Sequence, residues 1–227
     1  MSLILYGAPL SPFVRKVDVF LREKGVDFKN ESVNIMPMPD WFKEISPARR
    51  IPVLRDTSVG AEGTAGTIPD SSAICAFAEK KHRDPALYPS DAFELGRATW
   101  FEEWADSELA GRVGMGIFRP IMFPRFKGEE SDLKTAAKTW REDLPRLFDY
   151  LEAELEGADF LVGGSLSIAD IAVACQMTNL ELVAGLPDPG RWPNVVAHTQ
   201  RLRDRPSFGP NLAICRKVIG EAVDLDA

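Results

Sequence analysis

Residues 11–17 read SPFVRKV and follow the short apolar run LILY at residues 3–6. Ser11 is a favoured N-cap residue, and Pro12 suits the first helical position because its missing amide hydrogen would have no partner there. Gly25 is placed to end this helix in a left-handed turn. Free backbone N–H groups and the positive end of the helix dipole therefore converge beside Ser11. The stretch predicts a strand followed by a helix entrance that stabilises an anion next to a hydroxyl.

Length and composition describe an ordinary globular protein. The chain has 227 residues, 45% of them hydrophobic, which is enough for one large domain or two small ones. Its net charge of −7, with no Lys/Arg stripe, argues against partners such as nucleic acid or an acidic membrane surface. The sequence opens without a basic leader or a long apolar stretch, so we expect no secretory signal, no membrane span and a cytoplasmic location.

Neither a metal site nor a serine hydrolase is predicted. Cys75, Cys175 and Cys215 are widely spaced in helical apolar patterns, which is typical of small core residues. The sequence contains no CxxC or HxxxH spacing. A Ser-His-Asp triad would have to use His82 or His198, and no GxSxG elbow is present.

The order of predicted elements in the first third of the chain is β-α-β followed by β-β-α. The first three elements form a parallel crossover, which we expect to be right-handed. This order is what a thioredoxin-like domain requires. The predicted elements after the first helix are a strand at 28–33, a short helix at 40–45, brief strands at 52–54 and 67–68, and a helix at about 71–81.

The segment 83–91 contains two prolines and is predicted as an interdomain linker. It separates a thioredoxin-like domain at residues 1–82 from an all-helical domain at residues 92–227. The predicted fold class is therefore an α/β thioredoxin-like N-terminal domain, with a mixed four-stranded sheet, and an all-α C-terminal domain.

The second domain is predicted to contain only helices. A long amphipathic helix begins at Leu133, with a kink expected at Pro145. Ser167 and Asp170 form the strongest helix start, because a Ser at the N-cap and an acid three residues later satisfy each other's backbone amides. We therefore assign Asp170 to folding and not to catalysis. Two further helices are predicted at 193–203 and 206–219.

The SPFVRKV stretch resembles the cytosolic glutathione transferases, whose active-site Ser, Cys or Tyr lies at the first strand-to-helix turn. Glutaredoxins and Cys-type transferases have CPFCRKV-like stretches, but Ser11 and Val14 stand where their two thiols lie. Dithiol redox chemistry through this motif is thus excluded. The resemblance to serine-type, bacterial members implies that Ser11 donates a hydrogen bond to the glutathione thiolate. Tyr6 is the alternative donor, since some classes use a tyrosine on the first strand.

Two further stretches resemble the glutathione-binding segments of this family. Residues 46–54, SPARRIPVL, match the stretch in which a proline follows a cis bond before the third strand. The resemblance implies that Ile51 and Pro52 present the backbone to the cysteinyl part of glutathione as an added strand. The pair Asp70-Ser71 matches the family's Glu/Asp-Ser pair, so Asp70 would take the γ-glutamyl ammonium and Ser71 the carboxylate.

The carboxylate at the glycyl end of glutathione is expected to bind a cationic side chain. Arg49 is the first choice, although it matches a position that is His in some insect-type classes. Lys43 is a weaker candidate, and either cation can instead be solvated surface. Met38 falls where Cys-type classes place a glutathione-binding Lys, which puts one contact in doubt. The resemblance also places Phe13 in the glutathione site.

The run MGIFRPIMFP at residues 115–124 is the candidate lining of an electrophile pocket, with Met115, Phe118 and Met122 as its main residues. Met and Phe side chains form a deformable, polarizable surface that suits hydrophobic electrophiles. The alternative is that this run is core or dimer contact.

The resemblance as a whole implies a glutathione transferase that acts as a homodimer and uses glutathione as co-substrate. The alternatives are a glutathione-dependent peroxidase or isomerase on the same scaffold, or a non-catalytic binding or stress protein.

Overall fold

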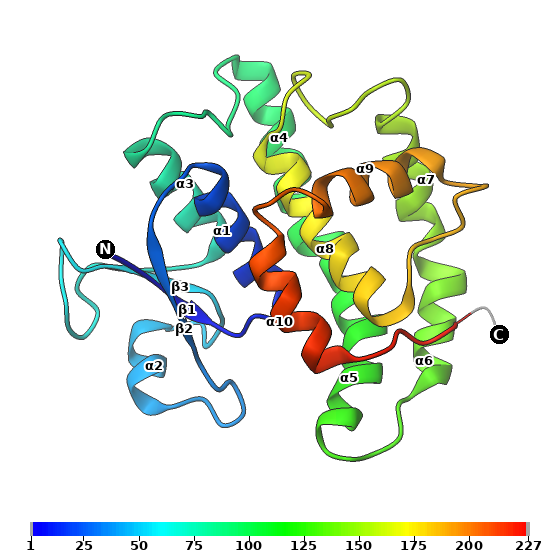
Figure 1. Cartoon of the computed structure of the whole chain (residues 1–227), viewed down its shortest axis with the longest axis horizontal. Coiled ribbons are helices and arrows are strands. Elements are labelled where there is room, and N and C mark those ends of the chain that lie inside the picture. The colour runs from blue at the N-terminus through cyan, green and yellow to red at the C-terminus, as the bar shows by residue number, and fades with distance from the viewer. Residues whose placement is uncertain (1, 226–227) are drawn as a thin grey trace. The chain divides into compact units, whose positions relative to one another are not determined.

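The chain divides into two compact units, and the division falls after Tyr88 (Figure 1). The computed structural model describes residues 2–225. The division lies within the segment 83–91 that the prolines mark in the sequence.

Unit 1 is built on a four-stranded mixed sheet in the order β2-β1-β3-β4. β1 pairs in parallel with β2 and antiparallel with β3, which in turn pairs antiparallel with β4. The predicted thioredoxin-like class is confirmed. The strands are β1 (Leu3–Gly7), β2 (Phe28–Ser32), β3 (Val53–Asp56) and β4 (Thr67–Pro69).

Helices cover both faces of this sheet, with α1 (Pro12–Glu23) and α3 (Ser71–Lys81) on one face and α2 (Asp40–Ile45) on the other (Figure 1). Alternation along β1 explains the arrangement. Gly7 lies so close to Val14 of α1 that a Cβ atom would overlap it. Tyr6 points the other way and packs with Phe42 of α2.

The connection between β3 and β4 is held by a buried guanidinium. Arg55 donates hydrogen bonds to the carbonyls of Gly63 and Ala65, both at 2.7 Å. Burying a cation is costly unless its donors are satisfied. Here the connection supplies carbonyl acceptors for the two terminal nitrogens, while the buried Nε has no partner among the described residues. This contact orders a segment that is too long for a simple hairpin.

Among its described residues, unit 2 contains helices joined by loops and no strand. A first run comprises α4 (Ala92–Trp104), the π-helical segments η1 (Ala105–Leu109) and η2 (Gly111–Phe118), and α5 (Arg119–Phe126). The long helix predicted from Leu133 is divided at Pro145, as expected. Its parts and the remaining helices are α6 (Leu133–Lys138), π-helical η3 (Thr139–Asp143), α7 (Pro145–Glu154), α8 (Ile168–Ala184), α9 (Pro193–Arg203) and α10 (Gly209–Ile219).

The capping box predicted for α8 is present. Asp170 is fully buried, and its Oδ2 accepts hydrogen bonds from the backbone N–H and the hydroxyl of Ser167 at 2.9 and 3.0 Å. Its Oδ1 accepts from the Leu161 N–H at 2.8 Å and lies 3.0 Å from Nε2 of His198. The carboxylate therefore joins three segments of unit 2, which confirms its assignment to folding.

The three cysteines are core residues, as predicted. Cys75, Cys175 and Cys215 are buried and form no disulfide. Over residues 2–225, no helix combines the length and the apolar character that crossing a bilayer requires.

Candidate functional site

Ser11 lies at the entrance of α1 as a capping residue. Its Oγ accepts a hydrogen bond from the N–H of Val14 at 3.4 Å, and its own N–H donates to the carbonyl of Ala8. Within the described residues, the hydroxyl hydrogen has no acceptor, so it remains to be donated to a ligand. A half-buried hydroxyl thus sits among the first-turn amides of a helix, which is the environment predicted from the sequence.

Asp70 and Ser71 form the entrance of α3. The Oδ1 atom of Asp70 accepts hydrogen bonds from the N–H groups of Ser72 and Ala73, at 2.9 and 3.1 Å. Asp70 also has a positive φ of 113°, which L residues rarely adopt. Its other oxygen, Oδ2, has no partner among residues 2–225 and is available to an ammonium. Ser71 follows as the first helical residue and is buried.

A buried lysine joins these two helix entrances. Lys16 of α1 is 1% exposed, and its Nζ donates a hydrogen bond to Oγ of Ser72 at 3.1 Å. The sequence analysis did not single out this residue. The signal was present, because Lys16 lies three residues after Phe13 and four before Phe20 and therefore on the apolar side of α1.

The Ile51–Pro52 peptide bond is cis, as the resemblance implied. Ile51 is half-buried against the cluster around Tyr6, and the carbonyl of Pro52 accepts a hydrogen bond from the N–H of Asp70 at 3.4 Å. The β3 entrance and the α3 entrance are therefore in direct contact. Arg49 precedes this bend, is exposed and has a φ of 52°.

Lys43 and Phe13 were candidates for the glutathione site, whereas Met38 stands where Cys-type classes place a glutathione-binding Lys. Lys43 pairs with Asp40 at 2.7 Å, and that hydrogen bond holds the pKa of the Asp40 carboxyl below its usual range. Met38 packs against the cluster around Tyr6, and Phe13 is half-buried at the start of α1. With its charge already paired, Lys43 is a poorer cation for glutathione than Arg49.

Tyr6 is enclosed by aromatic rings. It is 8% exposed and makes edge-to-face contacts with Trp41 and Phe42, at ring-centroid distances of 5.5 and 6.4 Å. Its side chain lies on the α2 face of the sheet, whereas Gly7 lies against α1.

The predicted electrophile residues lie along the η2–α5 run of unit 2. Met115 is 57% exposed, whereas Met122 is 1% exposed. Phe118 is half-buried and makes an edge-to-face contact with Phe123 at 6.5 Å. The structure thus places one of these three side chains at the surface and one in the interior.

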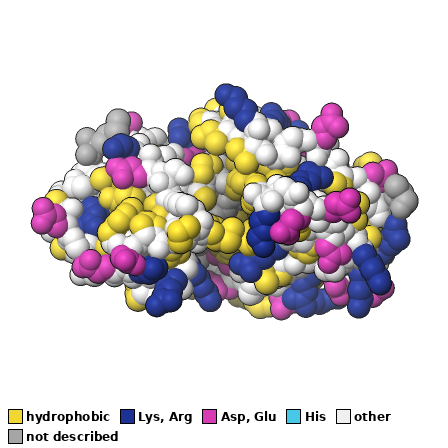
Figure 2. Space-filling view, turned by 90° about the horizontal axis from the view of Figure 1, so that it is seen from below, with side chains coloured by type: hydrophobic (Ala, Val, Ile, Leu, Met, Phe, Trp, Pro, Cys, Tyr) yellow, Lys and Arg dark blue, Asp and Glu magenta, His cyan; other side chains and the backbone are white. Residues whose placement is uncertain are grey.

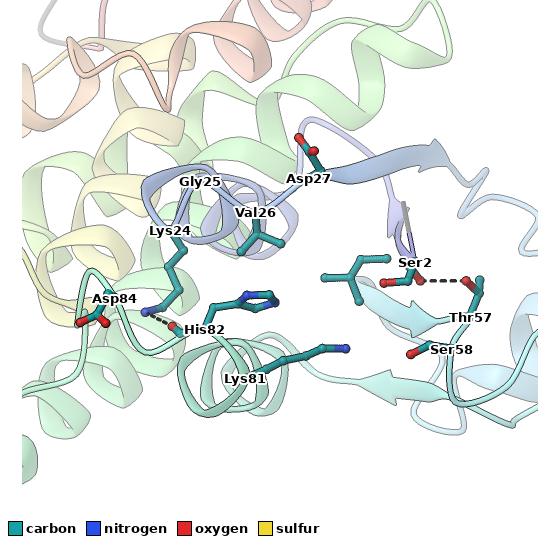
Figure 3. A pocket seen from close by; sticks show the side chains of 11 residues that line it. Ser2, Lys24, Gly25, Val26, Asp27, Thr57, Ser58, Lys81, His82 and Asp84 are labelled. Atoms are coloured by element: carbon teal, nitrogen blue, oxygen red, sulfur yellow. Dashed lines mark hydrogen bonds between the residues drawn. The ribbon is translucent and has the colours of Figure 1, made fainter.

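An open cavity of about 830 Å³ lies at the far end of α1 from Ser11 (Figure 3). Both of its lysines are already paired. Lys24 contacts Glu79 at 2.6 Å and donates to the His82 and Pro85 carbonyls, and Lys81 pairs with Asp56. Across residues 2–225, no three His, Cys, Asp or Glu side chains are grouped so as to hold a metal ion. The cavity shares no residue with the predicted glutathione site.

The surface on the α2 side of unit 1 carries hydrophobic side chains that the sequence analysis did not single out. Figure 2, which views the molecule from that side, shows hydrophobic side chains grouped among charged ones. Large exposed hydrophobic residues in this part of the chain are Ile35, Met36 and Trp41.

Comparison with known proteins identifies the family. The family described as "Glutathione S-transferase, N-terminal domain" matches residues 5–86, and "Glutathione S-transferase, C-terminal domain" matches residues 113–206. The uncharacterized GST-like protein YibF of Escherichia coli (strain K12) is 32% identical over 217 residues, covering 90% of this chain and 95% of that protein. The chain belongs to the glutathione S-transferase family.

Two other similar proteins bear on what this family member does. FtsZ-localized protein A of Caulobacter vibrioides is 27% identical over 212 residues, covering 92% of this chain and 90% of that protein. A glutathione S-transferase structure from Rhodospirillum rubrum F11 superposes with a TM-score of 0.82 at 26% identity, covering 97% of this chain and 93% of that one. Both relatives are similar to this chain over most of its length, but one is named as a glutathione S-transferase and the other by its localisation with FtsZ.

Proposed function

We propose that this protein is a glutathione transferase that binds glutathione and stabilises its thiolate, so that the sulfur attacks a hydrophobic electrophile. The observation that carries the proposal is the position of Ser11. Its hydroxyl lies at the amide-rich entrance of α1 with its hydrogen available to a ligand. Tyr6 is less suited to this role, because its ring is packed against Trp41 and Phe42.

The energies involved are sufficient for this role. A free thiol has a pKa of about 8.5, so little of it is ionised at neutral pH. Lowering that pKa by about 2 units requires about 2.7 kcal/mol of preference for the thiolate. A hydrogen bond to a charged group contributes about 1.5–3 kcal/mol, and a helix N-terminus adds roughly 0.3–1 kcal/mol. The two together reach the required value without a general base.

The remaining glutathione contacts follow from the two other entrances. The cis bend at Ile51–Pro52 presents backbone groups to the cysteinyl residue. Asp70 takes the γ-glutamyl ammonium through Oδ2, and Ser71 takes the carboxylate through its hydroxyl and N–H. Arg49 takes the glycyl carboxylate.

The electrophile is proposed to be hydrophobic, because the η2–α5 run offers Met and Phe side chains. Met115 and Phe118 are the residues of the predicted pocket that the structure leaves exposed or half-exposed. We also propose that the enzyme is cytoplasmic and acts as a homodimer, as the family resemblance implies. Sedimentation velocity at micromolar concentration tests the second point, and a single monomeric boundary would contradict it.

The first test is Ser11→Ala. We expect kcat to fall about 10- to 100-fold, because a hydrogen bond to a charged group is lost. The dissociation constant for glutathione should change less than threefold, since its other contacts remain. The measurements are steady-state kinetics with an aryl halide, an epoxide and a hydroperoxide, and calorimetry with glutathione.

Two control variants sharpen this test. Ser11→Thr keeps the hydroxyl and the cap, whereas Ser11→Ala also removes the cap of α1, which costs about 1 kcal/mol of stability. Kinetics are therefore compared well below the melting temperature of each variant. Tyr6→Phe should leave turnover nearly unchanged. Unchanged turnover in Ser11→Ala would move the assignment to Tyr6 or to backbone amides.

A non-catalytic role is the second candidate, and the similarity to FtsZ-localized protein A favours it. Calorimetry separates the two candidates, because a chain without glutathione binding at millimolar concentration is not a transferase. If glutathione binds, product analysis separates conjugation from peroxidase or isomerase chemistry. Oxidised glutathione indicates a peroxidase, and regenerated glutathione indicates an isomerase.

A further inference from the structure

We infer that Lys24 fixes residues 82–88 to unit 1, so that the segment that can bend between the two units begins only after Tyr88. This inference does not depend on the proposed function. The prolines of the segment 83–91 predict a linker over its whole length. The structure places the division after Tyr88, within that segment, and the contacts of Lys24 explain why its earlier part belongs to unit 1.

The ammonium of Lys24 is surrounded by acceptors. Lys24 follows the last residue of α1, and its side chain is fully buried. Its Nζ donates hydrogen bonds to the carbonyls of His82 and Pro85, at 2.8 and 2.7 Å, and lies 2.6 Å from Oε2 of Glu79 in α3. Figure 3 shows this side chain extending from the end of α1 to the His82 carbonyl. An ammonium has three N–H donors, so these three acceptors match it. We call Lys24, Glu79 and the two carbonyls the Lys24 clamp.

Burial makes the Lys24 clamp hard to open. A buried cation that loses an acceptor is left with an uncompensated charge, which costs far more than the loss of an exposed ion pair. Two of the acceptors are backbone carbonyls, so the chain at His82 and Pro85 cannot move away without leaving the ammonium in this state. The backbone of residues 82–85 is therefore held against the end of α1.

The same cluster holds the residues that follow. Oε2 of Glu79 also accepts a hydrogen bond from the N–H of Leu87 at 3.2 Å, and the Leu87 side chain is buried. Tyr88 packs edge-to-face against Phe20 of α1, with the ring centroids 5.9 Å apart. Nζ of Lys24 lies 5.4 Å from the centroid of that same Phe20 ring. Helices α1 and α3 and the start of the predicted linker thus meet around one ammonium.

The Lys24 clamp leaves only a short connection between the units. Asp91 caps α4 through two backbone N–H groups, so the first helix of unit 2 is fixed from that residue onward. Pro89 and Ser90 alone lie between Tyr88 and this cap. Release of residues 83–88 would lengthen the free segment by six residues and add up to about 20 Å of reach. The clamp therefore sets the reach of the connection.

The test measures backbone motion by NMR relaxation of the amides, in the natural protein and in Lys24→Met, without any ligand. In the natural protein we expect order parameters of about 0.85 for residues 86–88, equal to those of β1. In Lys24→Met the values for residues 86–88 should fall below about 0.6, because Glu79 and the two carbonyls lose their common partner. The values for β1 should not change.

Two further variants control this test. Lys29→Met removes one positive charge from an exposed lysine of β2 and should leave all order parameters unchanged. Glu79→Gln keeps an acceptor for the Leu87 N–H but removes the charge that pairs with Lys24. A smaller fall over residues 86–88 is expected from it, and it carries the comparison if Lys24→Met does not fold.

Three results would overturn the inference. The first is an order parameter below about 0.6 for residues 86–88 of the natural protein, which would mean that the segment moves despite the Lys24 clamp. The second is unchanged order there in a folded Lys24→Met protein, or in Glu79→Gln if Lys24→Met does not fold. The third is an equal fall in β1, which would mean that Lys24 only supports the fold of unit 1. None of these measurements involves glutathione, so the proposed function is tested separately.

Discussion

At the scale of single residues, Asp170 is a fully buried carboxylate that joins three segments of unit 2. Its carboxylate accepts from Ser167 and Leu161 and contacts His198, all away from solvent. We expect Asp170→Ala to lower the free energy of unfolding by roughly 3–5 kcal/mol, because it leaves several buried donors without acceptors. Urea unfolding followed by tryptophan fluorescence measures this loss.

The matched control is Asp91→Ala. Asp91 also caps a helix, accepting from the N–H groups of Phe93 and Glu94 at 2.9 and 3.0 Å, but it is exposed. Its removal should cost only about 1 kcal/mol, since water replaces the lost acceptor. Similar losses in the two variants would show that burial of Asp170 is not what makes it important.

Sequence patterns predict single residues well only where the partners are close along the chain. Ser167 and Asp170 are three residues apart, so their spacing alone predicted the capping box. The spacing says nothing of His198, which meets the same carboxylate from 28 residues away. Lys16 was missed for the same reason, because Ser72 lies 56 residues further along.

At the scale of elements, the packing of η2 against η3 depends on a glycine. A Cβ atom at Gly116 would lie 2.5 Å from Cγ2 of Thr139, whereas one at Gly114 would meet nothing within 4 Å. Gly116→Ala should therefore destabilise the protein by about 1–3 kcal/mol through overpacking. Gly114→Ala should stabilise it by up to about 1 kcal/mol, because alanine favours helix. Thermal unfolding measures both.

Gly114→Ala is the matched control for Gly116→Ala, because the substitution is identical and the two positions are two residues apart in η2. Shifts of the melting temperature in opposite directions would support the close approach of η2 and η3. Shifts in the same direction would mean that helix propensity alone, and not the contact with Thr139, sets the response.

Element boundaries followed from the sequence wherever local signals were strong. The predicted helices at 40–45, 71–81 and 193–203 agree with the observed bounds of α2, α3 and α9. The last helix begins at Gly209 instead of Pro206, because residues 206–208 form a turn in which Gly209 donates to the Pro206 carbonyl. The π-helical segments were not predicted. A wider helical turn hardly changes the spacing of apolar residues, and that spacing is the signal by which helices are predicted from sequence.

At the scale of the whole molecule, acid stability depends on a carboxyl in unit 1. Burial alone would raise the pKa of Asp56, but hydrogen bonds from Lys81 and Ser58 outweigh it and lower that pKa below its usual value. The contribution to stability is therefore fully present above the ordinary carboxyl pKa of about 3.9. It is lost as the pH falls through the lowered folded pKa.

We expect the free energy of unfolding to fall steeply below about pH 4 in the natural protein. The fall should be shallower in Asp56→Asn, which lacks the titrating group. Urea unfolding between pH 3 and pH 7 measures both profiles. Asp132→Asn is the comparison: hydrogen bonds from Thr135 lower the pKa of that exposed carboxyl too, so its profile should also be shallower than that of the natural protein, but by less than in Asp56→Asn. An Asp56→Asn profile parallel to that of the natural protein would contradict the prediction.

The order of elements made the two-part architecture predictable, since each strand and helix has its own local signal. Contacts that close unit 1 were not predictable in the same way. Lys24, for example, donates to the Pro85 carbonyl 61 residues away. The region around the α1 entrance combines both cases, because Ser11 was recognisable from its own stretch, whereas the contact of Lys16 with Ser72 became visible only in the folded chain.

The burial of Cys75, Cys175 and Cys215 has a practical consequence for work on this protein. Alkylating reagents need an accessible sulfur, and the sulfur atoms of all three cysteines are buried in the native chain. A reactive electrophile added together with glutathione will therefore be consumed by the peptide and not by the catalyst. Reagent loss beyond that in glutathione alone therefore reports catalysed conjugation with little loss to protein labelling, and slow labelling of the chain itself would signal unfolding.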